Sequence, residues 1–127
     1  MRSAIVLAGL ILTAPALAAE PVDTALVLEV DVSLSVNDQR YELQKEGIAA
    51  AFESKSVTDA ITSGGHGAIE VTVVEFSDPD RQIQVVPWTR IASVADAAAL
   101  AQRIRAVHRS SRGLTGVADA MLAARDM

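Results

Sequence analysis

A nearly continuous apolar run over residues 24–32, TALVLEVDV, restricts the fold of this 127-residue chain more than any other feature. Uninterrupted runs of this kind are typical of strands buried on both faces, as at the centre of a parallel sheet, and Glu29 is the single misfit. The run leads into Asp31-Val32-Ser33-Leu34-Ser35, after which Asn37 can cap a helix. The order of strand, polar loop and helix therefore predicts an α/β fold.

A helix is predicted over residues 38–55, because larger apolar side chains recur there on one helical stripe. Tyr41, Ile48 and Phe52 form this stripe. The small and polar residues Ser63-Gly64-Gly65 are expected to end the unit.

Two strands are predicted over residues 68–77 and 81–88, since the first segment is rich in β-branched side chains and the second continues the extended pattern. Only Asp78-Pro79-Asp80 separates them, and three residues can close an antiparallel hairpin but not a parallel crossover. Pro87 has no N–H group, so we expect the second of these strands to lie at an edge of the sheet.

Two more helices are predicted towards the C-terminus, separated by a polar loop over residues 109–113. Apolar and small side chains at helical spacing mark one face of each helix. The first face consists of Val94, Ala97, Ala98, Ala101, Ile104 and His108, and the second of Val117, Ala120, Met121 and Ala124. Together with the preceding segments, these helices make one small domain at most.

Composition excludes several classes of protein. The chain has no cysteine, which rules out disulfide scaffolds, thiol nucleophiles and thiolate zinc sites. Its net charge of -5 argues against a nucleic-acid-binding surface, which needs clustered lysine and arginine. The one basic cluster, formed by Arg103, Arg105, Arg109 and Arg112, is interpreted as the solvated end of a helix or, alternatively, as an anion-binding site.

Residues 1–18 have the features of a signal peptide: a basic start, an apolar stretch from Ala4 to Leu12 and the small-x-small pattern Ala16-Leu17-Ala18. Pro15 interrupts the segment, and the apolar stretch barely reaches the roughly 20 residues that a membrane-spanning helix needs. We therefore expect a mature domain over residues 19–127 that is periplasmic or secreted and has no stable membrane anchor after cleavage.

The polar loop contains three candidate metal ligands, Asp31, Ser33 and Ser35. In an open α/β sheet, ligands bind at the carboxyl ends of the strands, where this loop begins. A carboxylate and two hydroxyls are hard oxygen ligands of the kind that Mg²⁺, Mn²⁺ or Ca²⁺ prefers, and their low combined charge predicts weak binding. Thr115, which opens the last predicted helix, is expected to bring a fourth oxygen to the same edge. In the alternative interpretation, Ser33 and Ser35 only cap and turn the chain, and Asp31 favours the helix N-terminus.

The Asp-x-Ser-x-Ser motif at residues 31–35 and Thr115 in LTGVADAM, together with the antiparallel hairpin, resemble the von Willebrand factor A domain over residues 22–127. The segment VVPWTRI at residues 85–91 adds a likeness to an uncharacterised secreted bacterial branch of that family. The resemblance implies a three-layer Rossmann-like sandwich and a metal-ion-dependent adhesion site. In such a site Ser33, Ser35 and Thr115 would bind the metal, Asp31 would hold waters and outer contacts, and a carboxylate of the protein ligand would complete the metal shell.

The chain departs from the family pattern at two places. Leu34 stands where the family usually has glycine, at a tight turn beside the metal. Met127 lies in the third predicted helix, before the family's fourth strand and second aspartate, so we expect a truncated reading frame or a fragment. This N-terminal portion holds the central parallel strand, a helix, the hairpin, a second helix and the start of a third. Its first strand has an uncovered edge, which favours self-association.

The sequence thus predicts a secreted, non-catalytic module that binds a protein ligand through a divalent cation held by Asp31, Ser33, Ser35 and Thr115. One alternative is a Mg²⁺-dependent phosphohydrolase with Asp31 as nucleophile, since an aspartate after an apolar strand also starts the haloacid dehalogenase pattern. That pattern needs a second aspartate as acid and base where this chain has Ser33. The other alternative is a truncated remnant in which no functional site forms.

Overall fold

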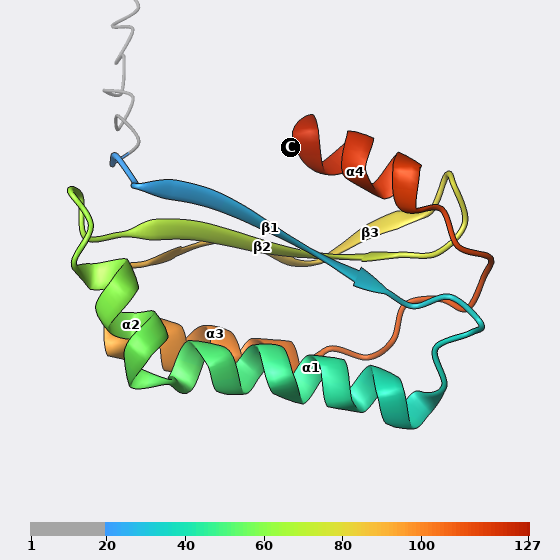
Figure 1. Ribbon diagram of the computed structural model, residues 1–127, viewed down its shortest axis with the longest axis horizontal. Helices are drawn as coiled ribbons and strands as arrows, with labels where there is room; N and C mark the ends of the chain where they lie inside the picture. Colours follow the sequence, from blue (N-terminus) through green and yellow to red (C-terminus); the bar gives the residue numbers. More distant parts are fainter. Residues whose placement is uncertain (1–19) are drawn as a thin grey trace, which may run out of the picture.

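The computed structural model describes residues 20–127, so the predicted signal peptide lies outside the described residues. Figure 1 shows the path of this part of the chain. Its elements are, in order, β1 (Thr24–Asp31), α1 (Asp38–Glu53), α2 (Lys55–Thr62), β2 (Ile69–Phe76), β3 (Gln82–Ile91), α3 (Val94–Ala106) and α4 (Val117–Arg125). Within residues 20–127, none of the helices combines the length and the apolar character that crossing a membrane requires.

The sheet has the strand order β1-β2-β3. β1 pairs in parallel with β2 from Thr24 opposite Ile69 to Asp31 opposite Phe76, and β2 pairs antiparallel with β3. The predicted hairpin is therefore confirmed, and Pro87 lies on an edge strand as expected. β3 runs three residues further than predicted, because pairing with β2 continues as far as Ile91.

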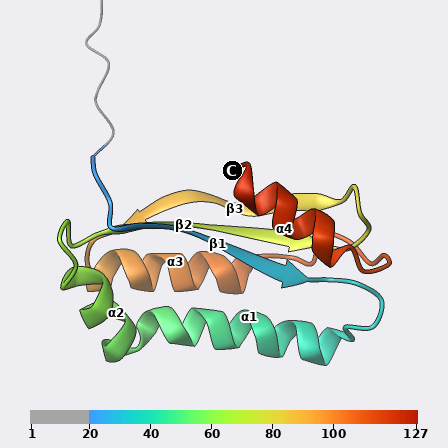
Figure 2. The same cartoon turned by 45° about the horizontal axis from the view of Figure 1, so that its top comes forward.

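Helices cover the two faces of the sheet unequally. In both views α1 and α3 lie on one face, and α4 lies on the opposite face (Figures 1 and 2). The main core is between the sheet and the α1–α3 layer, since alternate residues of a strand point to the same face. It includes Val30, Val71, Val73, Phe52, Leu100 and Ile104. The predicted α/β class is therefore confirmed: a mixed three-stranded sheet has helices on both of its faces.

The first helix ends earlier than predicted, and a second helix, α2, was not predicted. α1 ends at Glu53, and Ser54 has an extended backbone with φ -74° and ψ 139°. Ser54 then caps α2 by accepting a hydrogen bond from the Val57 N–H group at 3.4 Å. Burial of Thr58 and Ile61 docks α2 on the core. A serine followed by apolar residues four positions apart, Val57 and Ile61, is the sequence signal for this break.

The two predicted C-terminal helices are present, but the residues buried on each helix differ from the predicted ones. In α3 the predicted contact Val94 is 66% exposed, and His108 lies beyond the helix, which ends at Ala106. In α4 only Ala120 is buried, whereas Met121 is 69% exposed. α4 lies against β1, and its larger side chains Met121 and Leu122 stay exposed.

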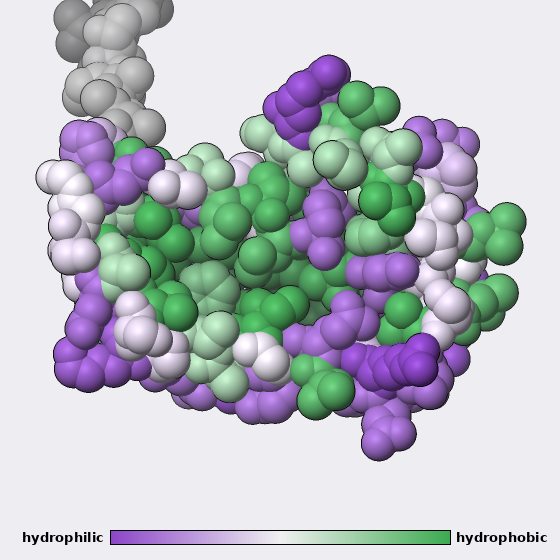
Figure 3. Space-filling model, viewed as in Figure 1, coloured by the Kyte–Doolittle hydropathy of each residue, from purple (hydrophilic) through white to green (hydrophobic). Residues whose placement is uncertain are grey.

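Most residues of β1 are half-buried or exposed, so the prediction that this strand is buried on both faces is wrong. Among its residues only Val30 is buried, because no strand of the described chain pairs with its other edge and α4 covers only part of its outer face. Figure 3 shows hydrophobic residues gathered along this side of the molecule between the α1 layer and α4. The predicted uncovered edge of the first strand is therefore confirmed for residues 20–127.

Glu29 on this edge strand is expected to make stability depend on pH. Both of its carboxyl oxygens are buried and have no hydrogen-bond partner in the described part of the chain, and burial raises the pKa of Glu29 above its ordinary value of 4.5. The folded protein then holds the proton to a higher pH than the unfolded chain, so the free energy of unfolding falls as the pH rises above about 4.5.

We expect Glu29→Gln to raise the free energy of unfolding by about 1 kcal/mol at pH 7, because it removes a buried charge. Below the ordinary carboxyl pKa the gain should vanish, since the glutamate is then neutral in both states. Urea unfolding of both proteins at a series of pH values measures this difference. A gain that is the same at every pH would contradict a charge effect.

Candidate functional site

The candidate site lies where the β1–α1 loop meets the segment between α3 and α4, residues 107–116. Figure 1 shows both at the end of the molecule where β1 and β2 finish. The Leu34 N–H group donates to the Gly113 carbonyl at 2.8 Å, and the Gly116 N–H group donates to the Ser77 carbonyl at 2.6 Å. The carboxyl ends of the two parallel strands therefore carry both segments that contain candidate ligands, as expected.

Asp31, Ser33 and Ser35 lie together in the β1–α1 loop. The Asp31 carboxylate accepts a hydrogen bond from the Ser33 N–H group at 2.8 Å, and the Oγ atoms of Ser33 and Ser35 are 3.0 Å apart, within hydrogen-bonding distance. Ser33 is buried, Asp31 is half-buried and Ser35 is exposed. The Asp31 contact is a local turn interaction of the kind that the alternative interpretation requires, whereas α1 is capped by Asn37, which accepts from the Arg40 N–H group at 2.8 Å.

Thr115 does not take part in the hydrogen bonds that join Asp31, Ser33 and Ser35. It is exposed, and it lies two residues after Gly113, the residue that hydrogen-bonds to the β1–α1 loop. Among residues 20–127 the structure has no hydrogen bond between the Thr115 hydroxyl and Ser33 or Ser35. The fold thus brings the segment of Thr115, rather than its hydroxyl, against the loop.

Two hydroxyl oxygens of the loop have a separation that would suit neighbouring ligands of a hard divalent cation. In an octahedron with metal–oxygen bonds of about 2.1 Å, neighbouring ligands stand about 3.0 Å apart. The Ser33 and Ser35 hydroxyls have this separation. Residues 20–127 contain no group of three or more histidine, aspartate or glutamate side chains arranged to hold a metal, so a cation here would rest on hydroxyls and one carboxylate. Such a set carries little charge, and the weak binding that follows from it stays a prediction.

Arg109 joins the two segments, a role that the sequence analysis missed. One of its terminal nitrogens, Nη2, donates to the carbonyl oxygens of Val32 and Ser33, both at 2.8 Å. Nε donates to the Ser111 carbonyl at 3.1 Å, and Nη1 lies 3.2 Å from the Asp38 carboxylate. The Arg109 side chain is only 8% exposed, so this arginine is part of the interior beneath the loop.

The predicted basic cluster does not form a common anion site, because its other members are paired with groups of the protein itself. Arg103 donates to the Thr89 hydroxyl, and Arg105 makes paired hydrogen bonds with Glu46 and Glu53. The hydrogen bonds from Arg105 lower the pKa of the Glu46 and Glu53 carboxyls. Arg112 pairs with Asp38 at 2.5 Å.

A buried carboxylate, Glu75, lies beneath the 107–116 segment and was also missed. It is 2% exposed and accepts hydrogen bonds from the Tyr41 hydroxyl at 2.6 Å and the Ser110 N–H group at 2.7 Å. Burial, followed by the hydrogen bond to Glu75, raises the pKa of Tyr41, so its hydroxyl stays a donor at neutral pH. Glu75 appears in the sequence as an isolated charge within a β-branched strand, which is the only local signal of its burial.

The hairpin turn supports the same segment from the other side. The Asp78 carboxylate accepts from the Leu114 N–H group at 2.8 Å and lies so close to Gly113 that a side chain at that position would collide with it. Ser77 and Ser111 share a hydroxyl contact of 2.7 Å. The position of Thr115 therefore depends on the β2–β3 turn as well as on Arg109.

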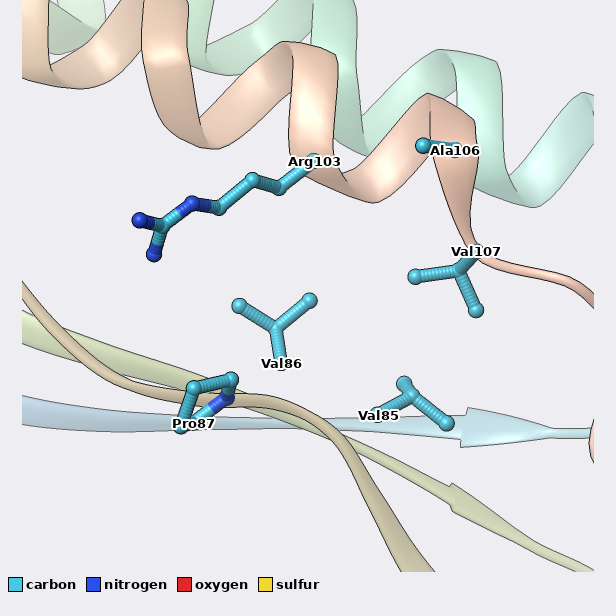
Figure 4. Close-up of a pocket in the computed structure, with 6 residues that line it drawn as sticks. All are labelled: Val85, Val86, Pro87, Arg103, Ala106 and Val107. Atoms are coloured by element: carbon cyan, nitrogen blue, oxygen red, sulfur yellow. The ribbon is translucent and has the colours of Figure 1, made fainter.

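The larger cavities lie elsewhere. Figure 4 shows one of about 400 Å³ between β3 and the end of α3, where the Arg103 side chain extends over an apolar floor. Its lining consists of Val85, Val86, Pro87, Arg103, Ala106 and Val107. A second cavity, of about 440 Å³, lies between β1 and α2 and is mostly apolar. None of the four candidate metal ligands lines either cavity.

The chain is similar to a family of proteins and to solved structures of a pilus tip protein. The family described as "Protein of unknown function (DUF1194)" matches residues 21–127. A structure of three N-terminal domains of the type V pili tip protein Mfa5 from Porphyromonas gingivalis has 18% sequence identity to the chain and a TM-score of 0.47; the match covers 83% of this chain and 17% of that one. A structure of the vWF domain of the same protein has 19% identity and a TM-score of 0.46, and the match covers 83% of this chain and 32% of that one. None of the curated proteins matches the chain.

Proposed function

The chain belongs to the DUF1194 family of proteins of unknown function, and we propose that it is a non-catalytic protein-binding domain whose β1–α1 loop binds a divalent cation. The separation of 3.0 Å between the Ser33 and Ser35 hydroxyls, next to the Asp31 carboxylate, carries this proposal. Thr115 is proposed as a fourth ligand, because its segment hydrogen-bonds to the loop. Mg²⁺ is the proposed ion, with Mn²⁺ and Ca²⁺ as substitutes that use the same oxygen ligands.

The proposed partner is a protein that presents a carboxylate to the cation. A bound Mg²⁺ supplies a position at which a carboxylate oxygen can replace water. The side chains of Leu34 and Leu114 are 68% and 71% exposed. The Leu34 N–H group donates to the carbonyl of Gly113, the residue before Leu114, so the backbones at the two leucines lie close together. Large apolar side chains exposed beside a polar site favour a partner whose carboxylate has apolar neighbours.

The absence of catalysis is part of the proposal. Phosphoryl transfer from a substrate to an aspartate nucleophile needs an acid, two residues further on, that protonates the leaving group of the substrate. That position holds Ser33, which is 1% exposed and is hydrogen-bonded to Ser35. We propose a secreted or periplasmic location on the basis of the signal peptide predicted over residues 1–18.

We expect Mg²⁺ to shift the backbone NMR signals of Ser33, Ser35 and Thr115 with a dissociation constant on the order of 10⁻³ M, as for weak cation sites. Asp31→Asn should abolish these shifts, because it removes the negative charge while keeping an oxygen that can accept from the Ser33 N–H group. Ser63→Ala, which changes an exposed serine at the end of α2, serves as the control and should bind Mg²⁺ like the wild type.

Sodium acetate, as the simplest carboxylate, then tests the partner chemistry. It should perturb the same signals in the presence of Mg²⁺ and leave them unchanged without the metal. Absence of any Mg²⁺-dependent shift in the wild type would overturn the proposed metal site. Metal shifts that acetate does not alter would overturn the proposed partner chemistry and leave a cation site alone.

A further inference from the structure

We propose that Arg109 is the positioning residue of the candidate site: its guanidinium holds the β1–α1 loop and the 107–116 segment in a single arrangement. This inference rests on the proposed function in so far as the loop that Arg109 orders is the proposed metal loop. The ordering itself is a property of the protein without metal and can be measured separately.

The contacts of Arg109 are divided between the two segments. Val32 and Ser33, whose carbonyl oxygens both accept from Nη2 at 2.8 Å, are almost completely buried. The Ser33 carbonyl also accepts from the Val36 N–H group at 3.0 Å, whereas the Val32 carbonyl has Arg109 as its donor in the described chain. A buried carbonyl without a donor is costly, so the Val32 oxygen in particular needs the guanidinium. On the other side, Nε donates to the Ser111 carbonyl within the 107–116 segment at 3.1 Å. One planar group therefore holds three backbone carbonyls from two segments that are more than 70 residues apart in sequence.

The guanidinium is itself held in place from below. Its central carbon lies 5.5 Å from the centre of the Tyr41 ring, a distance typical of a cation–π contact. The Tyr41 hydroxyl is fixed by Glu75, which also binds the Ser110 N–H group beside Arg109 in the chain. A second cation, Lys45, lies 5.4 Å from the same ring and donates to the Val107 carbonyl at 3.0 Å. The arginine thus sits on a hydrogen-bonded base that includes the start of the 107–116 segment.

Two other roles for Arg109 fit the contacts less well. An anion-binding role would need free donors, whereas here Nε and Nη2 are directed to backbone carbonyls. A role as a plain ion pair would depend on Asp38, whose side chain is 70% exposed, and exposed pairs contribute little. Arg112 provides the comparison, because it pairs with the same carboxylate and is itself 55% exposed. Of these two arginines, Arg109 alone combines the ion pair to Asp38 with hydrogen bonds to backbone carbonyls.

The test uses Arg109→Lys, with Arg112→Lys as the matched control. Lysine keeps the charge but loses the planar fork that serves several carbonyls at once. In the metal-free protein, we expect hydrogen exchange of the Leu34 amide to become about tenfold faster in Arg109→Lys and to stay unchanged in Arg112→Lys. The amides of β2, the central strand, should keep their protection in both variants. Where Mg²⁺ binds, Arg109→Lys should also weaken it by about tenfold, the usual effect of losing an outer contact of a metal site.

The outcomes separate the inference from the proposed function. Unchanged exchange at Leu34 in Arg109→Lys would overturn the positioning role, and so would faster exchange that is equal at Leu34 and in β2, which indicates general destabilisation. Failure of the wild type to bind Mg²⁺ would overturn the proposed function while leaving the exchange result intact. If Arg109→Lys does not fold, the wild type provides the test: slow exchange of the Arg109 Nε–H proton, relative to that of Arg112, is expected, and equally fast exchange would overturn the inference.

Discussion

Replacing Gly116 with alanine is expected to lower the free energy of unfolding by about 2 kcal/mol, an effect typical of overpacking in a rigid site. A Cβ atom at this position would lie 2.8 Å from the Cα and N atoms of Pro79. These are backbone atoms of the hairpin turn, so no side-chain rotation can relieve the contact. Gly116 also donates its N–H group to Ser77, and a shift that relieves the clash would lengthen this hydrogen bond. Urea unfolding of the variant and the wild type measures the loss.

Gly47→Ala is the matched control for this prediction and should have the opposite sign. Gly47 lies within α1, and nothing stands within 4 Å of the place that a Cβ would occupy. Alanine is favoured over glycine in a helix by about 1 kcal/mol, so this variant should be more stable than the wild type. Equal stability of Gly116→Ala and the wild type would mean that the hairpin turn does not restrain the start of α4.

Glu75→Gln is expected to lower the free energy of unfolding by about 2 kcal/mol, because it disrupts a buried carboxylate that accepts a hydrogen bond at each oxygen. The Tyr41 hydroxyl and the Ser110 N–H group both donate to this carboxylate, one to each oxygen. Glutamine offers only one oxygen, so its amide nitrogen would face one of the two donors. The size and shape of the side chain stay the same, and the loss therefore reports hydrogen bonding rather than packing.

Glu70→Gln on the same strand is the control for Glu75, and a half-buried position of this kind should change stability by less than about 0.5 kcal/mol. Thermal or urea unfolding can measure both variants. The Ser110 amide should also lose protection from hydrogen exchange in Glu75→Gln. A variant as stable as the wild type, with Ser110 still protected, would show that Glu75 does not fix the 107–116 segment.

The sequence allowed prediction of those parts of the fold that depend on local patterns. The three residues between the two strands of the hairpin are too few for a parallel crossover connection. The length of this loop therefore predicts the antiparallel pairing of β2 and β3. Asn37 marks the start of α1 because its side chain accepts a hydrogen bond from the Arg40 N–H group, one of the first N–H groups of the helix that have no partner within it. The grouping of Asp31, Ser33 and Ser35 follows from their places in one short loop.

The features that were missed depend on contacts between distant segments. Arg109 looks like one member of a basic cluster until the fold sets it beneath Val32 and Ser33, which are 77 and 76 residues away along the chain. The break at Ser54 was missed because residues 38–55 form an acceptable helix by spacing alone, and docking of α2 on the core decides where α1 ends. Met121 was placed on the inner face of its helix because periodicity does not show how much of a sheet a helix will cover.

The edge position of β1 would link strand pairing to ligand binding at this end of the molecule. Asp31 is the last residue of β1, and in the described chain the opposite edge of this strand carries no partner. A chain that paired with this edge would therefore form hydrogen bonds with the backbone that leads directly into the candidate metal loop. If such pairing raises the affinity of the loop for its ligand by some factor, thermodynamic reciprocity requires the ligand to strengthen the pairing by the same factor. Strand addition and binding at the loop would then act as mutual effectors through a single stretch of backbone.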